Sequence, residues 1–415
     1  MKNIKLLPIF VLLLALAGKN QAQEVRKSLK ECIDIALQNN LTVKAGKSAL
    51  ERAKVMQGTA FSIDKTQFTL SQDPTSGGSP DNAFSISQSF DFPTVYVSRY
   101  GLLKAETNLE KSNLELTRNE LVRQVSAVYE QLLYAAEKVR VLQAQDSIFQ
   151  KFVFLATTKF RSGETGRLEQ MNAERLHNEN RIALQQAEKD YQSVQLALQR
   201  RLNTGDLINP AETALHVLEN PFAAGEFNPA QNPVNKVFES KKLIGEKSLS
   251  LAKQGFLPGI NFALRSQYLL KGYNPYNIDR KLFAGGNQMG FEVGVDIPLF
   301  FGEQMAKAKA ARREVEILKT QQEDALLSLA HEYQMALNEY EKAKKALDYY
   351  LTQGNAIAEE IGRITQTSYE QGEIGYIEYI QNLKSTIELH LQYAEAVNAY
   401  NQAVIGLKYL QGTAE

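Results

Sequence analysis

The ten residues FRSGETGRLE at positions 160–169 decide the fold, because a second version of them, YEQGEIGYIE, occupies positions 369–378. The displacement of 209 residues also aligns four later positions. Those pairs are Glu179 with Glu388, Ala187 with Ala396, Tyr191 with Tyr400 and Leu198 with Leu407. Upstream, at a slightly different displacement, residues 91–93 (DFP) match residues 296–298 (DIP). This self-similarity predicts a tandem duplication of a unit of about two hundred residues.

Two long stretches of the chain are predicted to be helical. None of the 11 prolines lies between Pro93 and Pro210, and none follows Pro298. Because proline breaks helices, both stretches favour very long helices, and a continuous helix over 95–157 would be roughly 95 Å long. Apolar residues in both stretches recur at alternating steps of three and four, as in the seam of paired helices. They are Leu121, Val125, Val128, Leu132, Ala136 and Val139, and then Leu326, Leu329, Tyr333, Ala336, Tyr340, Ala343 and Leu347.

The quoted segments predict where each long helix reverses. Both contain a Gly-Glu-x-Gly turn, Gly163–Gly166 in the first and Gly372–Gly375 in the second. Glycine accepts the backbone conformations that tight turns need. We expect the returning helices to end near Asn203 and Gln411, which completes one long helical hairpin in each repeat.

Each hairpin is preceded by residues that alternate between apolar and polar, which is typical of strands. The clearest alternation covers residues 289–299, and its counterpart covers 84–92. Candidate partner strands cover 61–70, where the alternation slips, and 260–270. Turn-rich segments at 73–81 and 273–287 separate each pair. The sequence therefore predicts two strands in each repeat.

The N-terminus has the pattern of a secretory signal. Lys2 and Lys5 precede an apolar run over 6–17, and a small residue, Ala22, follows. The run is too short to span a bilayer, so we interpret residues 1–23 as a signal peptide. A short N-terminal anchor helix is the alternative. Cys32 lies beyond the cleavage point, inside a predicted helix over 29–38, so we do not interpret it as a lipid-anchored first residue.

The domain organisation follows from the repeats. We expect a first repeat over 24–203, with a helix, a strand pair at about 60–92 and a helical hairpin at about 94–203. A proline-rich connector over 204–233 then leads to a second repeat over 234–412. That repeat has a helix, a strand pair at about 259–299 and a hairpin at about 300–411.

Four amphipathic strands cannot close a barrel within one chain, and an open sheet edge is unacceptable in a bilayer. Copies of the chain must therefore complete the barrel. Two copies give eight strands and a filled lumen, whereas three give twelve strands and a passage. A passage suits the small residues on the polar faces, so we expect a homotrimer. Those residues are Ser85, Ser87, Ser89, Gly290 and Gly294.

These features resemble the TolC-type outer-membrane efflux ducts over essentially the whole mature chain. The resemblance rests on residues 29–40 (LKECIDIALQNN), the strand endings 88–93 (QSFDFP) and 295–300 (VDIPLF), and the paired hairpin turns. It implies a mainly α fold with a β-barrel portion. It also implies a homotrimer in the cell outer membrane and its lipid, with a twelve-stranded barrel and a periplasmic α-helical tunnel. A passive conduit of a tripartite efflux pump would dock to a periplasmic adaptor and an inner-membrane efflux transporter. The segment 90–96 (FDFPTVY) resembles the heavy-metal cation branch of the family, although Cys, His and Met are too sparse for a metal relay.

The resemblance also implies functional residues. Adaptor docking maps to the tips of the hairpins, although a glutamate replaces the hydrophobic residue that usually follows the glycine. These tip residues are Ser162, Gly163, Glu164, Gln371, Gly372 and Glu373. A pore constriction maps to Glu378 and Gln381, where symmetry-related carboxylates would attract cations. The alternative is that Glu378, like Glu169, lies on an ordinary solvated helix face.

Other classes of function find little support. With 47 basic and 47 acidic residues, the chain lacks the basic excess of nucleic-acid binders. The Glu174–His177 spacing suits a di-iron site, but the equivalent positions are Leu383 and Thr386, so we expect no metal site. No nucleotide loop or hydrolase motif occurs, so we expect neither an enzyme nor a cofactor. A structural coiled-coil envelope protein without a pore is the remaining alternative.

Overall fold

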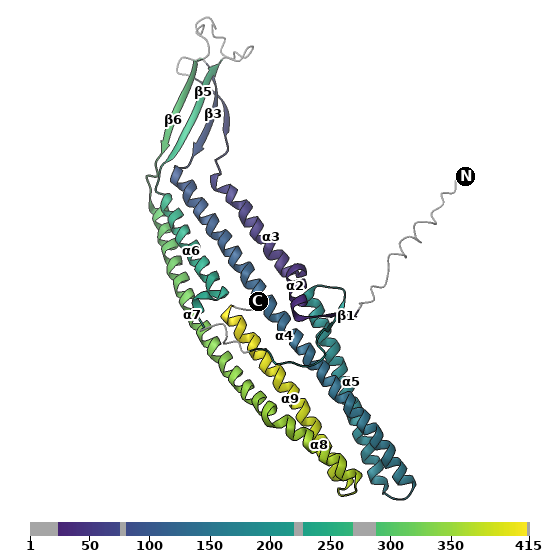
Figure 1. The fold of residues 1–415 in the computed structure, drawn as a ribbon. Coiled ribbons are helices and arrows are strands. Elements are labelled where there is room, and N and C mark those ends of the chain that lie inside the picture. Colours follow the sequence, from purple (N-terminus) through teal and green to yellow (C-terminus); the bar gives the residue numbers. More distant parts are fainter. Residues whose placement is uncertain (1–23, 75–79, 220–226, 269–287, 413–415) are drawn as a thin grey trace, which may run out of the picture. The chain divides into compact units, whose positions relative to one another are not determined.

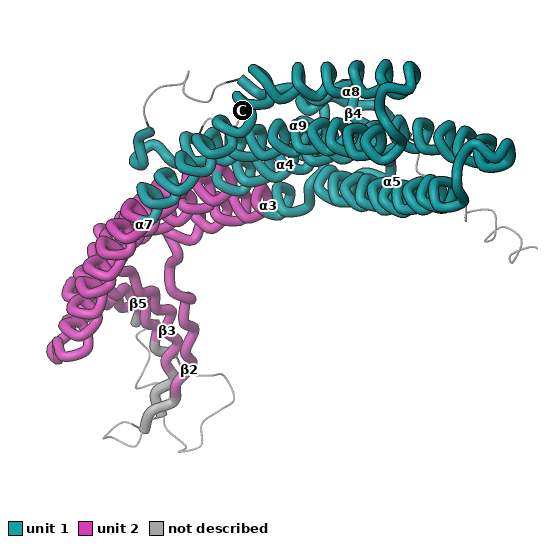
Figure 2. Tube along the Cα trace, turned by 90° about the horizontal axis from the view of Figure 1, so that it is seen from below, with its two compact units in different colours: residues 1–45, 116–232, 328–415 teal, residues 46–115, 233–327 magenta. Residues whose placement is uncertain are grey.

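The computed structural model describes residues 24–74, 80–219, 227–268 and 288–412. The predicted signal peptide and the predicted loop at 273–287 lie outside these residues. Two compact units form from separate pieces of the chain (Figure 2). Unit 1 comprises residues 1–45, 116–232 and 328–415, and unit 2 comprises residues 46–115 and 233–327.

Unit 2 contains an antiparallel sheet of four strands in the order β2-β3-β5-β6 (Figure 1). The strands are β2 (Gln67–Pro74), β3 (Pro80–Phe90), β5 (Gly259–Tyr268) and β6 (Gln288–Asp296). Of these four strands, the first and the last along the chain, β2 and β6, are therefore the two edges of the sheet. Strands from the two predicted repeats, β3 and β5, pair at its centre.

The sheet has one apolar face and one face of small and polar residues. Directly paired residues project to the same side of a sheet. Ile86 of β3 pairs with Leu264 of β5, which pairs in turn with Phe291 of β6. The apolar face holds Phe68, Leu70, Phe84, Ile86, Phe90, Ile260, Phe262, Leu264, Met289, Phe291, Val293 and Val295, with Gln88 and Ser266 as its polar members. This face is exposed in the single chain, and 82% of the Phe291 surface is open to solvent.

The predicted boundaries of the strands need three corrections. The prediction of a strand over 61–70 is wrong at its start, because residues Gln57–Phe61 form a 3-10 turn (η1) after α3 (Leu41–Met56). The Gln88 side chain accepts a hydrogen bond from the Thr66 hydroxyl and donates one to the Asp64 carbonyl oxygen. Residues 64–66 are therefore held by a side chain and not by the backbone hydrogen bonds of a strand. The other two strands end earlier than expected, β3 at Phe90 and β6 at Asp296.

Unit 2 also contains most of helix α3, all of helix α6 (Pro233–Gln254) and parts of the two long helices. Helix α6 comes close to α7 (Gly302–Tyr349) at Gly245. A Cβ atom at Gly245 would lie 2.6 Å from Leu318 Cδ1, so a larger residue here would require the Leu318 side chain to move.

Unit 1 holds the ends of two helical hairpins. The first hairpin consists of α4 (Pro93–Arg161) and α5 (Arg167–Leu202). The second consists of α7, a π-helical turn η5 (Tyr350–Gly354), α8 (Asn355–Glu370) and α9 (Tyr376–Gln411). All residues of the predicted seams lie on the long helices α4 and α7, and all are buried or half-buried. No helix among the described residues has both the length and the apolar character needed to cross a membrane.

Shorter elements complete unit 1. Helix α2 (Leu29–Asn39) confirms the prediction over 29–38, and Ser28 and Glu31 form a capping box at its start. The predicted connector contains a strand, β4 (Leu207–Pro210), which pairs in parallel with β1 (Glu24–Lys27), and a 3-10 turn, η3 (Pro229–Gln231). Strands of four residues are too short for an alternation pattern, so the sequence did not reveal them.

Candidate functional site

The hairpin turns have the backbone geometry that the repeated glycines suggested. Gly163 and Gly372 have φ values of +78° and +76°, a region that glycine adopts without strain. In both turns the glutamate after the glycine closes the helix end. The Glu164 N–H donates to the Lys159 carbonyl oxygen at 2.9 Å, and the Glu373 N–H donates to the Ser368 carbonyl oxygen at 2.8 Å.

The side chains of these two glutamates also bind within their own turns. Ser162 Oγ donates to Glu164 Oε1 at 2.8 Å, and Ser368 Oγ donates to Glu373 Oε2 at 2.9 Å. The six predicted tip residues all lie in the turns and are all exposed. The glutamates that replace the expected hydrophobic residues therefore stabilise the turns, while their remaining acceptor sites face the solvent.

Near the turns, an aromatic cluster joins the two hairpins. Phe152 of α4 stacks on Tyr376 of α9, with ring centroids 4.8 Å apart and an interplanar angle of 4°. Tyr379 stacks on Tyr369 of α8 at 4.3 Å. Burial is the main cause that raises the pKa of Tyr376 to about 12. The buried core of the cluster consists of Phe149, Phe152, Ala156, Ala173, Leu176 and Ile380. This cluster was not predictable from the sequence, because the seam pattern does not reveal contacts between hairpins.

The predicted constriction residues line a groove between the starts of α5 and α9. Its volume is about 790 Å³, and both Glu378 and Gln381 are exposed along it. Glu169 lines the same groove, together with Asn172 and Asn382. The structure therefore brings the acidic residues of the two repeats to one groove, which sequence reasoning did not anticipate. The remaining lining residues are Gly166, Leu168, Gly375, Tyr376 and Ile377.

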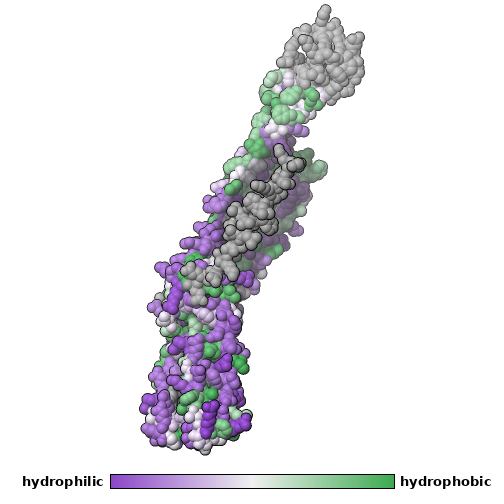
Figure 3. Space-filling view, turned by 90° about the vertical axis from the view of Figure 1, so that its right-hand side faces the viewer, coloured by the Kyte–Doolittle hydropathy of each residue, from purple (hydrophilic) through white to green (hydrophobic). Residues whose placement is uncertain are grey.

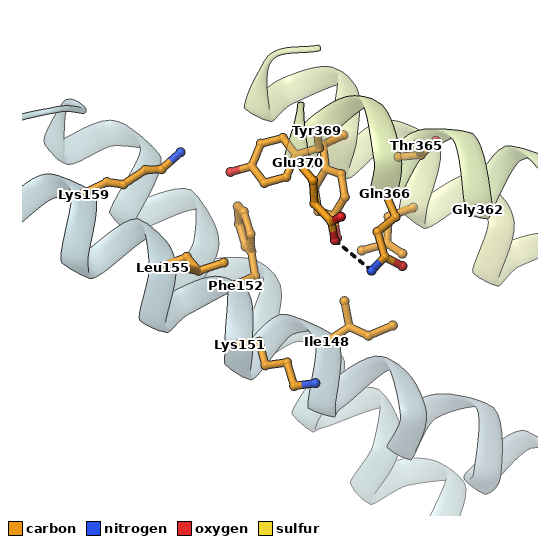
Figure 4. Close-up of a pocket in the computed structure, with 12 residues that line it drawn as sticks. Ile148, Lys151, Phe152, Leu155, Lys159, Gly362, Thr365, Gln366, Tyr369 and Glu370 are labelled. Carbon is orange, nitrogen blue, oxygen red and sulfur yellow. Dashed lines mark hydrogen bonds between the residues drawn. The ribbon is translucent and has the colours of Figure 1, made fainter. Parts of the chain in front are cut away.

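A second groove of about 540 Å³ lies between α4 and α8 (Figure 4). Phe152 and Leu155 of α4 face Tyr369 of α8 across it. Lys159 Nζ lies 5.5 Å from the centre of the Tyr369 ring, within the range of a cation–π interaction. Figure 3 shows hydrophilic residues over most of the hairpin ends and hydrophobic residues over the described strands.

The Glu174–His177 pair shows no metal-binding geometry. His177 Nε2 lies 3.3 Å from Asp146 Oδ1, and Glu174 accepts a hydrogen bond from Gln170. Within the described parts of the chain, no group of three or more His, Cys, Asp or Glu side chains could hold a metal ion. Cys32 is buried, and burial is the main cause that raises the pKa of its thiol to about 12.

Comparison with known proteins identifies the relatives of this chain. Residues 245–413 match the family model described as outer membrane efflux protein. This stretch of the chain is similar to the outer membrane efflux proteins. The match confirms the resemblance to TolC-type ducts, and the members of this family are channels, not enzymes. Among the curated proteins there is no match.

Several solved structures share the fold of this chain over almost its entire length. A membrane protein from Pseudomonas aeruginosa is 15% identical with a TM-score of 0.76, covering 94% of this chain and 92% of that chain. The Campylobacter jejuni CmeC outer membrane channel is 15% identical with a TM-score of 0.73, covering 93% and 86%. The open state of the Neisseria gonorrhoeae MtrE outer membrane channel is 17% identical with a TM-score of 0.74, covering 92% and 88%.

Proposed function

We propose that this protein is the outer-membrane channel of a tripartite efflux pump and acts as a passive conduit. The observation that carries the proposal is the sheet of unit 2. Its apolar face is exposed in the single chain. Among the described strands, the edge strand β2 pairs only with β3 and the edge strand β6 only with β5, so each has one unpaired side. In water this face would be a large aggregation hazard, whereas in a bilayer it matches the surrounding lipid.

Three copies of the sheet complete the proposed structure. Each open edge needs a partner strand inside a bilayer, so β2 of one copy pairs with β6 of the next until the barrel closes. Twelve strands leave a passage, and the face opposite the lipid supplies its lining. That face carries the charged residues Arg265 and Glu292 among small and polar residues, which include Ser85, Ser87, Ser89, Asn261, Ala263, Gly290 and Gly294. The long hairpins then form the periplasmic tunnel.

The hairpin ends supply the proposed contacts with partners. The exposed turns around Gly163 and Gly372 dock to a periplasmic adaptor, which links the channel to an inner-membrane transporter. Glu378 and Gln381 form the constriction, and three Glu378 carboxylates around one pore attract cations. The transporter selects the cargo, whether metal ions, drugs or other compounds.

The dimensions of the hairpins support the proposed duplication. Helix α4 has 69 residues, and α7, η5 and α8 together cover the same length, residues 302–370. The returning helices α5 and α9 have 36 residues each. Each bound in the first hairpin is 209 residues before its counterpart in the second, the same displacement that relates the two turns.

Two measurements on the full chain test the proposal. Native mass determination of the detergent-extracted mature protein should give a trimer, and reconstitution into planar bilayers should give ion conductance. A structural coiled-coil protein without a pore, the second candidate, predicts no conductance. A stable monomer that conducts no ions contradicts the channel architecture.

A further inference from the structure

A buried carboxylate lies in unit 1 where α4 and α9 meet residues 211–219, an irregular segment that we call the strap. Glu130 of α4 is 1% exposed. Its Oε2 accepts a hydrogen bond of 2.8 Å from Asn401 Nδ2 of α9, and its Oε1 has no hydrogen-bond partner in the described chain. A buried carboxylate that lacks partners is costly when it is ionised.

Asn401 fastens the strap to the same place. This side chain is 1% exposed, and its Nδ2 also donates to the carbonyl oxygen of His216 at 2.8 Å. Its Oδ1 accepts a hydrogen bond of 2.9 Å from the Leu218 N–H. Leu215 and Leu218 pack against a core cluster formed by α7 and α9. One amide thus connects the middle of the strap to the buried carboxyl of Glu130.

The imidazole of His216 connects the carboxyl of Glu130 to the solvent. Its Nε2 lies 3.7 Å from Glu130 Oε1, and 43% of the His216 side chain is exposed. Because this ring is partly exposed and lies beside the carboxyl, a proton can reach the pair from the solvent without any rearrangement of the helices.

We propose that Glu130 and His216 form a proton-dependent lock that holds the strap on α4 and α9, and that rising pH releases it. A proton on the imidazole gives opposite charges at the pair, and a proton on the carboxyl removes the buried charge. When the pair has lost both protons, the strap covers an ionised carboxylate that no cation compensates. Release lets water solvate this charge.

The surrounding groups determine the direction of the effect. Burial is the main cause that raises the pKa of Glu130, while His216 and Asn401 lower it and the charge of Glu212 raises it. A raised pKa means that the closed form binds the proton more tightly than an open form with an ordinary carboxyl. The stability of the closed strap therefore falls as the pH rises from the ordinary pKa of a carboxyl through the raised pKa of Glu130.

The start of the strap is anchored by a neutral phenol. Tyr129 of α4 donates a hydrogen bond of 2.8 Å to the Lys27 carbonyl oxygen and also contacts the carboxylate of Glu212. Burial raises the pKa of Tyr129, so this phenol stays protonated through the neutral range. The Lys27 ammonium group is engaged by Glu31 at 2.9 Å. The lock is thus confined to Glu130 and His216.

The sequence contains no tryptophan, so one introduced into the strap would report on the strap alone. Val217, which is 38% exposed, lies beside His216 and is replaced by tryptophan in the detergent-solubilised full chain. Between about pH 5 and pH 8, quenching by neutral acrylamide should increase with pH and reverse on acidification. The opening equilibrium should rise by at most about tenfold per pH unit, the limit for one proton.

Two further variants, each built on Val217→Trp, separate the lock from other titrations. Glu130→Gln should abolish the pH dependence, because an amide still accepts the bond from Asn401 but cannot ionise. Glu341→Gln, at an exposed position of α7, should leave it unchanged. His216→Gln should release the strap at lower pH, because the cationic partner is lost. The proposal is overturned if the quenching of a folded Glu130→Gln variant still depends on pH. It is also overturned if the pH dependence of the His216→Gln variant is the same as that of the parent.

Discussion

The two helical hairpins have the same length but differ in charge and in helical regularity. Between residues 146 and 181 the first hairpin carries six basic and five acidic residues, whereas residues 355–390 of the second carry two basic and six acidic ones. Only the second contains a π-helical turn. Length is constrained because the ends pack against each other through the aromatic cluster. The exposed surface has no such constraint, so it can specialise in each hairpin.

The largest expected effect comes from breaking the contact between the hairpins. Phe152→Ala should lower the free energy of unfolding by about 3–5 kcal/mol, because it removes a side chain that is 3% exposed and stacked on Tyr376. Phe154→Ala, two positions away and 71% exposed, is the matched control and should stay within about 0.5 kcal/mol. Denaturant unfolding measures both. Equal effects would mean that the cluster does not hold the hairpin ends together.

The π-helical turn gives the next largest effect. A Cβ atom at Gly354 would lie 2.7 Å from Tyr350 Cδ1, so Gly354→Ala should cost about 1–3 kcal/mol through overpacking. The position 209 residues earlier is Gln145, which already has a side chain. Gln145→Ala should therefore change stability little. Thermal unfolding of both variants tests whether the turn depends on its glycine.

The turn glycines should affect function more than folding. Gly163→Val or Gly372→Val forces a β-branched residue into a positive φ, at a cost of about 1–2 kcal/mol in a local turn. We expect impaired efflux with an intact trimer, measured by drug or metal tolerance of cells and by native mass. Gly166→Ala, at a φ of −80°, is the control. Normal tolerance in both valine variants would argue against docking by the turns.

The smallest expected effect concerns the groove residues. Glu378→Gln should reduce the cation preference in planar bilayers, because it removes one negative charge per chain from a confined passage. Glu169 lines the same groove, so Glu169→Gln should shift the preference in the same direction. Glu174→Gln, at an exposed position outside the groove, is the better control. Reversal potentials across a salt gradient measure all three, and identical values would place Glu378 outside the pore.

Long-period features were predictable from the sequence. The spacing of apolar residues revealed the seam from Leu326 to Leu347, and the repeated glycines located both turns. These features persist over many residues, so local preferences average out. The start of β2 was not predictable, because Phe61 continues the strand alternation while the chain is still completing the turn after α3.

Contacts between distant residues escaped sequence reasoning for a different reason. Tyr129 and Asn401 bind Glu212 and His216 of the connector, and Glu130 lies 3.7 Å from His216, although the seam pattern does not mark any of these helix positions. The pairing of β1 with β4 joins residues that are far apart in sequence. The groove shared by Glu169 and Glu378 likewise depends on how the hairpin ends pack. Such contacts need three-dimensional information, since no periodicity encodes them.

The open edges of the sheet also affect how the protein reaches its final state. A newly made chain carries two unpaired strand edges beside an apolar face, and such surfaces can pair with other exposed strands. Assembly therefore competes with aggregation, and the outcome depends on the local concentration of chains and on how fast they meet. Dilute chains would gain time before aggregating but would wait longer for partners. If the protein is the proposed outer-membrane channel, the rate at which chains meet in the periplasm decides how many of them assemble.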